Sequence, residues 1–199
     1  MSCCSPGILR ENDGMDAVTL LGSPRKEGNT ARVLNWVEDV LRDAGHSVER
    51  RWISDYAIAG CQECRRCKEG KVELCSIFDD GIAMLRRIVA ADMLVLAAPV
   101  FCWGFPGPLK CLLDRMYCLA DAESSSRIEG KPIALIVTAG GPEKDNADLL
   151  VKAYESMTAY MGAVTAGALV IANCAGPESL DAAVQERAKA FAEEVAGVL

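Results

Sequence analysis

Histidine is almost absent from this sequence: His46 is the only one among 199 residues. Enzymes that use a histidine general base need a well-placed imidazole, and zinc or copper sites commonly use several. A single histidine, just past the end of a predicted helix, disfavours both kinds of chemistry. The sequence therefore directs attention to a bound cofactor or to cysteine ligands.

An excess of positive charge and a long apolar run are also missing. The formal net charge is −7, whereas a nucleic-acid interface draws on clustered Lys and Arg. No apolar stretch approaches the roughly 20 residues that a membrane helix requires. The first residues, Met1 to Gly7, lack the apolar centre of a secretory signal. These features predict a cytoplasmic protein with neither nucleic acid nor a membrane as partner.

Cysteine, in contrast, is frequent, with ten residues in the chain. A disulfide framework is typical of short secreted domains, but this chain is longer, has 51% hydrophobic residues and carries no recognisable signal. Its length and composition are those of one ordinary domain with a sizeable core. The cysteines are therefore expected to bind a metal or a cluster, or to be scattered core thiols.

The apolar pattern predicts five strands, each followed by a helix. The strands are expected at about 17–22, 48–53, 93–98, 133–137 and 166–171. The helices are expected at about 30–44, 106–119, 146–161 and 180–199, with a further helix capped by Asp79 and Asp80. The second strand is broken by charged residues, as an edge strand tolerates.

Without a break in composition, this alternation predicts one α/β domain over residues 1–199, built on a doubly wound parallel sheet with helices on both faces. Residues 1–15 are expected to form a loose tail, and residues 57–78 a cysteine-rich insertion. Ligands of such sheets bind at the carboxyl ends of the strands. The loops after the first, third and fourth strands are therefore expected to carry function.

The loop after the first strand, Gly22-Ser-Pro-Arg-Lys-Glu-Gly-Asn-Thr30, leads straight into a helix and suits a phosphate. Backbone N–H groups at a helix N-terminus attract an anion, and short polar side chains add donors. The glycine spacing matches neither a Walker A motif nor the dinucleotide pattern, which favours a single terminal phosphate. The predicted ligands are Ser23, Arg25, Lys26, Gly28, Asn29 and Thr30. The alternative is a plain turn capped by Asn29.

Together with this loop, several further motifs resemble the NADPH-dependent FMN reductase and iron–sulfur flavoprotein family. They span about residues 18–171 and comprise Cys61-x-x-Cys64-x-x-Cys67 with Cys75 and Asp79-Asp80, Ala91-Asp92, Pro99-Val-Phe-Cys-Trp-Gly104, Leu109-Lys-x-x-Leu-Asp-Arg115, Thr138-Ala-Gly-Gly-Pro142 and Asn146-Ala-Asp148. The resemblance implies a flavodoxin-like three-layer sandwich with strand order 2-1-3-4-5. It also implies FMN as cofactor and assembly into a homodimer or homotetramer.

Two further loops are expected to hold the flavin ring. After the third strand, Phe101 and Trp103 offer flat apolar surface, and Gly104 permits close approach. After the fourth, Gly140 and Gly141 provide a bare backbone edge. The predicted flavin ligands are Pro99, Val100, Phe101, Cys102, Trp103, Gly104, Thr138, Ala139, Gly140 and Gly141. The alternatives are core or dimer-surface aromatics and an ordinary glycine turn.

The spacing C-x2-C-x2-C-x7-C places Cys61, Cys64, Cys67 and Cys75 as candidate ligands of a 4Fe–4S cluster. Zinc would also accept four thiolates, and free thiols packed against the fold are a third interpretation that stays open. Cys111 and Cys118 are expected to be inert thiols on one face of a helix.

The function predicted from these features is that of an FMN-dependent oxidoreductase. NAD(P)H would be the electron donor, and a small molecule such as a quinone, free flavin or metal ion the acceptor. Because backbone N–H groups can tune a flavin, no catalytic side chain is required. The alternatives are an electron carrier between protein partners, with or without a cluster, and a redox sensor.

Overall fold

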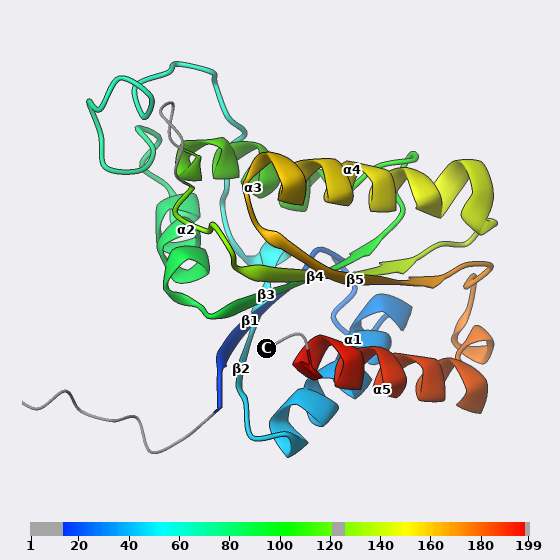
Figure 1. Ribbon diagram of the computed structural model, residues 1–199. Coiled ribbons are helices and arrows are strands. Elements are labelled where there is room, and N and C mark those ends of the chain that lie inside the picture. Colours follow the sequence, from blue (N-terminus) through cyan, green and yellow to red (C-terminus); the bar gives the residue numbers. More distant parts are fainter. Residues whose placement is uncertain (1–13, 121–125, 198–199) are drawn as a thin grey trace, which may run out of the picture.

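The five strands of the described residues lie in one sheet of order β2-β1-β3-β4-β5, and every neighbouring pair is parallel (Figure 1). The computed structural model describes residues 14–120 and 126–197. The strand order is that of flavodoxin-like sheets, so the predicted fold class is confirmed. Residues 1–13 of the expected tail lie outside the described residues.

The element bounds follow the predicted alternation closely. The strands are β1 Asp16–Leu21, β2 Ser47–Trp52, β3 Met93–Pro99, β4 Pro132–Thr138 and β5 Val164–Ile171. The α-helices are α1 Asn29–Asp43, α2 Asp80–Ala90, α3 Gly107–Arg115, α4 Asp148–Tyr160 and α5 Ala182–Gly197. Short helical turns are η1 Ile53–Asp55, η2 Met116–Leu119, η3 Glu143–Ala147 and η4 Pro177–Ser179. Within the described ranges, no helix has the length and apolar content that crossing a bilayer would demand.

Two apolar cores cover the two faces of the sheet. Helices α1 and α5 pack on one face, and α2, α3 and α4 lie on the other (Figure 1). Residues 93–98 of β3 and 133–138 of β4 are buried, as central strands covered on both sides should be. Strand β2 is only partly buried and forms one edge, as predicted from its charged residues.

Three predicted helix bounds were wrong by two residues or more, and one of them is the start of α5, at Ala182 instead of Leu180. The helix expected to reach Leu119 ends at Arg115 and continues as the 3-10 turn η2. The helix expected from Asn146 begins at Asp148, because Asp145 has a left-handed backbone with φ of 56°. The Asp148 carboxylate accepts the N–H groups of Asp145 and Asn146, which stabilises this irregular turn.

Candidate functional site

A cavity of about 340 Å³ opens at the carboxyl ends of β1, β3, β4 and β5. This is where ligands bind in doubly wound sheets. Most of the predicted flavin and phosphate ligands line it, namely Ser23, Arg25, Gly28, Asn29, Thr30, Pro99, Val100, Phe101, Thr138 and Gly140. The structure therefore brings together residues from three loops that the sequence had singled out separately.

The loop after β1 wraps tightly against the start of α1. The Ser23 hydroxyl accepts the N–H of Arg25 at 3.1 Å, and the Gly28 N–H donates to the Arg25 carbonyl at 3.2 Å. A Cβ on Gly28 would lie only 3.0 Å from the Arg25 Cβ, so this position favours glycine. None of the described side chains caps α1. The N–H groups of its first turn are therefore available to an anion.

Two buried threonines connect the floor of the cavity. The hydroxyls of Thr30 at the start of α1 and Thr138 at the end of β4 lie 2.7 Å apart and share a hydrogen bond. This contact fixes the helix start relative to the central strand. The cavity floor is thus built from a helix and a strand rather than from loops alone.

Asn29 has a different role from the helix cap that the alternative interpretation gave it. Gly28 occupies the N-cap position, and the Asn29 amide donates to the Gly176 carbonyl at 2.8 Å and to the Cys174 sulfur at 3.1 Å. The loop after β5 thereby becomes a wall of the cavity, which the sequence pattern did not reveal. Burial raises the pKa of the Cys174 thiol, so that thiol is neutral near pH 7.

Several predicted ligands do not line the cavity. The Lys26 ammonium binds the Asp55 carboxylate at 2.6 Å and lies 5.1 Å from the centre of the Trp52 ring. A Cβ on Gly141 would lie 2.7 Å from the Asn146 amide nitrogen, so this glycine permits close packing. The others outside the cavity lining are Cys102, Trp103, Gly104 and Ala139.

Residues 101–104 form a tight hairpin at the cavity mouth. Phe101 and Gly104 exchange two backbone hydrogen bonds of 3.0 Å, and both central residues, Cys102 and Trp103, have left-handed φ values of 48° and 58°. That is type I′ geometry, which costs a non-glycine residue about 1–2 kcal/mol. The Phe101 and Trp103 residues are 47% and 66% exposed. The hairpin thus presents aromatic surface instead of burying it.

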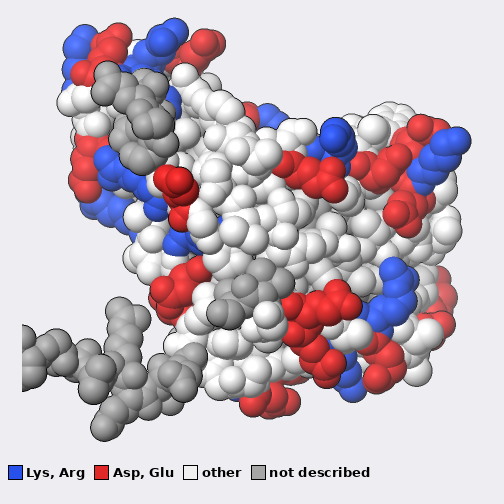
Figure 2. Space-filling view, viewed as in Figure 1, with Lys and Arg blue, Asp and Glu red and all other residues white. Residues whose placement is uncertain are grey.

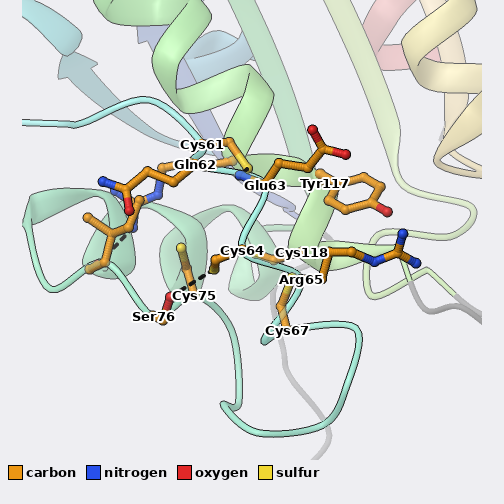
Figure 3. Close-up of a pocket in the computed structure, with 12 residues that line it drawn as sticks. Cys61, Gln62, Glu63, Cys64, Arg65, Cys67, Cys75, Ser76, Tyr117 and Cys118 are labelled. Carbon is orange, nitrogen blue, oxygen red and sulfur yellow. Dashed lines mark hydrogen bonds between the residues drawn. The ribbon is translucent and has the colours of Figure 1, made fainter.

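The candidate metal ligands gather elsewhere. Cys61, Cys64, Cys67, Cys75 and also Cys118 line a pocket of only about 20 Å³ (Figure 3). It shares no lining residue with the large cavity. The cysteine segment projects beyond α2 and α3 at the upper left of Figure 1, whereas the orange segment after β5, part of which lines the large cavity, lies at the lower right. Figure 2 shows both charge signs on this lobe, whereas the middle of the same face is mostly uncharged.

Hydrogen bonding and burial shift the pKa values of two of these thiols in opposite directions. The Cys64 sulfur lies 3.2 Å from the Ser76 hydroxyl, and this contact, helped by a backbone N–H at Arg66, lowers the pKa of the Cys64 thiol. The Cys61 sulfur accepts the Glu63 N–H at 3.4 Å. Burial, reinforced by the neighbouring thiols, raises the pKa of Cys118 to about 12. Exposed Cys64 is therefore the activated thiol, and Cys118 is a neutral one.

The place of Cys118 corrects the expectation that it lies with Cys111 on one face of a helix. Helix α3 ends at Arg115, and the following η2 turn winds by three residues per turn instead of 3.6. Cys118 therefore points into the cysteine pocket. Throughout residues 14–120 and 126–197, no three Cys, His, Asp or Glu side chains are arranged to hold a metal ion. The thiols share a pocket without surrounding one point.

Comparison with known proteins agrees with this architecture. Residues 15–176 match the family model of the NADPH-dependent FMN reductases. The chain belongs to this family. It is 31% identical over 105 residues to the iron–sulfur flavoprotein of Methanosarcina thermophila, a match that covers 53% of this chain and 54% of that protein. The chain thus spans about half the length of this curated relative.

One further curated relative of this FMN reductase family member, and one solved structure of similar fold, are quinone reductases by name. The FMN-dependent NADH:quinone oxidoreductase of a Shewanella strain is 29% identical over 123 residues, covering 57% of this chain and 60% of that protein. The solved structure of an NAD(P)H:quinone oxidoreductase from Methanothermobacter marburgensis superimposes with a TM-score of 0.68 at 20% identity, over 93% of this chain and 97% of that one. That structural likeness establishes the fold alone.

Proposed function

We propose that this chain binds FMN in the large cavity and uses it as an NAD(P)H-dependent oxidoreductase. The observation that carries the proposal is one cavity with an uncapped helix start at one side and an exposed aromatic residue, Phe101, in its lining. FMN has matching ends, a phosphate and an aromatic ring system. Membership of the FMN reductase family supports the same assignment.

The residues present fit a phosphate. The first turn of α1 offers backbone N–H groups, and its dipole favours an anion. Ser23, Asn29 and Thr30 lie beside these groups, and Arg25 adds a guanidinium that can form paired bonds to phosphate oxygens. Lys26 is held by Asp55 and is left out of this set.

The residues around the cavity mouth fit a ring. Phe101 and the ends of β3 and β4 provide apolar and backbone surface. A Cβ added to Gly140 would have no neighbour within 4 Å, so nothing among the described residues obstructs approach to its backbone. When bound, FMN supplies the transfer of hydride and electrons, and the chain binds and orients it. The only histidine, His46, accepts the Met15 N–H and does not line the cavity.

The proposal is tested by mixing the purified protein with NADPH or NADH without oxygen. Rapid bleaching of a flavin absorption band by either nucleotide, followed by reoxidation with a quinone, is the expected result. If the band bleaches only with a reduced ferredoxin, the chain is instead a carrier of electrons between proteins. A preparation that retains no flavin and binds none when FMN is added contradicts the proposal.

The cysteine pocket favours a second candidate function, electron transfer through an iron–sulfur cluster. Its donor set suits a 4Fe–4S cluster in kind, since thiolates are the usual ligands and backbone N–H groups such as that of Glu63 stabilise their sulfurs. The name of the Methanosarcina relative agrees. Because the thiols do not surround one point, loading a cluster requires the segment to close. Cys61, Cys64, Cys67 and Cys75 would then be the ligands.

Iron and sulfide analysis of protein prepared without oxygen tests this second function. About four iron and four sulfide per chain are expected for a cluster of this type. Zinc without sulfide would make the site structural. Neither metal nor sulfide, even after reconstitution with ferrous iron and sulfide, would leave FMN as the sole cofactor.

A further inference from the structure

Arg115 is a buried cation in the wall of the cysteine pocket. It is the last residue of α3, and its side chain is 0% exposed. A buried charge is costly unless it is paired and hydrogen-bonded. The partners of this guanidinium therefore show what the residue is for.

The guanidinium of Arg115 joins both ends of the cysteine segment. Its Nη1 donates to the Asp79 carboxylate and, at 3.5 Å, to the Ala59 carbonyl, and its Nη2 donates to the Ile77 carbonyl at 3.0 Å. Ala59 precedes Cys61 by two residues, and Ile77 follows Cys75 by two residues. One side chain thus sets the distance between the two ends of the segment that carries the candidate ligands.

One donor of this guanidinium is left over. The Arg115 Nε–H is buried, and no hydrogen-bond partner exists for it among the described residues. An unmade buried hydrogen bond costs about 1–3 kcal/mol, and more for a charged group. A guanidinium stays protonated inside proteins, so Arg115 is a cation here, and both Asp79 and the candidate ligand Cys75 interact favourably with its charge. Arg115 already has a counter-charge in Asp79, and its remaining Nε–H, in the wall of a pocket lined by five thiols, still lacks an acceptor.

We propose that Arg115 is the positioning residue of a metal centre in this pocket: it holds the ends of the cysteine segment together and leaves Nε–H to a negatively charged, thiolate-bound centre. The inference rests on the metal site proposed above. Four thiolates around either zinc or a 4Fe–4S core carry a net negative charge, so both occupants suit the cation.

The test uses the full chain reconstituted without oxygen with ferrous iron and sulfide. Arg115→Met removes the charge and the donors, Arg115→Lys keeps the charge without the fork, and Arg86→Met is the matched control. Arg86 lies on α2, is 63% exposed and contacts Glu73 outside the pocket lining. Three quantities are measured: the iron and sulfide content per chain, the rate of iron loss to a chelator, and the reduction potential of the centre. FMN content reports whether each variant is folded.

We expect wild type and Arg86→Met to load equally. Arg115→Met should lose most of its iron and sulfide, and any centre that remains should have a lower potential, because a cation stabilises the more negative reduced state. Arg115→Lys should load but release iron faster than wild type. Equal loading, release rate and potential in Arg115→Met overturn the proposal. Should that variant fail to fold, unchanged release from Arg115→Lys overturns it.

If the chain has no metal site at all, the experiment gives a different result. Wild type would then take up neither iron nor zinc, and the proposed role of Arg115 would fall with the site. Loading of wild type without any effect of Arg115 substitution contradicts only the positioning role.

Discussion

The side-chain amide of Asn29 donates a hydrogen bond to the carbonyl oxygen of Gly176, 2.8 Å away and 147 positions along the chain. The bond joins the start of α1 to the loop after β5, on either side of the large cavity. A ligand bound there therefore has a wall that depends on one amide group.

Replacing Asn29 with alanine should weaken FMN binding about tenfold. The change removes a hydrogen bond worth roughly 1–1.5 kcal/mol to the wall, and a factor of ten corresponds to 1.4 kcal/mol. Quenching of FMN fluorescence on titration measures the affinity. Asn35→Ala, on an exposed turn of the same helix, serves as the control and should bind like wild type. Unchanged affinity in Asn29→Ala would remove this residue from the site.

The Arg115–Asp79 pair should contribute strongly to the stability of the chain. Asp79→Asn leaves a buried cation without its counter-charge, which costs about 3–5 kcal/mol. Urea unfolding at pH 7 measures the free energy. Asp114→Asn on α3 breaks only an exposed pair with Lys110 and should cost less than about 1 kcal/mol. Similar losses in the two variants would contradict the role given to the buried pair.

The Arg115–Asp79 pair also makes the free energy of unfolding depend on pH in the acid range. Arg115, together with the Ala59 and Gly81 N–H groups, outweighs burial and holds the pKa of Asp79 below its ordinary value. The stability it contributes is fully present above the unfolded pKa of about 3.9 and is lost as pH falls through the lower folded value. The difference in unfolding free energy between wild type and Asp79→Asn should therefore shrink below about pH 4. A difference that stays constant down to pH 2 would exclude this linkage.

Cys64 should be the first cysteine of the metal-free pocket to react with an alkylating agent near pH 7. Thiolate is the reactive form, and the Ser76 hydroxyl lowers the pKa of Cys64. Ser76→Ala should shift the pH profile of Cys64 alkylation upward, as followed by mass spectrometry of peptides. Cys118, with a pKa of about 12, should stay unmodified in both proteins. Faster labelling of Cys118 than of Cys64 would contradict this order.

We expect the chain to form a dimer or tetramer through the hairpin at residues 101–104. Trp103 and Phe101 are too exposed to serve as core residues, and the strained turn holds them outward. Light scattering at micromolar concentration should give the mass of two or four chains, and Trp103→Ser should reduce it. Tyr160→Ser removes a similarly exposed aromatic residue from α4 as the control. A mass of one chain for the wild type would count against the assembly.

Much of this architecture was predictable from local sequence. The apolar run at 93–98 identified a central strand, and Asp79 caps α2 by accepting the Gly81 N–H, as its position before the helix suggested. The loop from Gly22 to Thr30 lies at the cavity because the end of the first strand of such a sheet leads there. These features depend on short-range patterns that one sequence displays.

The missed features depend on contacts between distant segments. Nothing in Cys174 to Pro177 resembles a binding motif, and its place follows from β5 lying beside β4, where the Cys174 N–H donates to the Ala139 carbonyl at 2.7 Å. Cys118 was assigned to the wrong environment because the period of an α-helix was extended past Arg115. Lys26 was included for its charge, and its pairing with Asp55 could not be read from the sequence.

Calorimetric titration of the flavin-free protein with FMN and with riboflavin tests the central claim most directly, since the two ligands differ only in the phosphate. Charge-assisted hydrogen bonds contribute about 1.5–3 kcal/mol each, and two such bonds correspond to a factor of at least about one hundred. The loop after β1 should therefore bind FMN at least about a hundredfold more tightly than riboflavin. Equal affinity for both ligands, or binding of neither, would contradict the account.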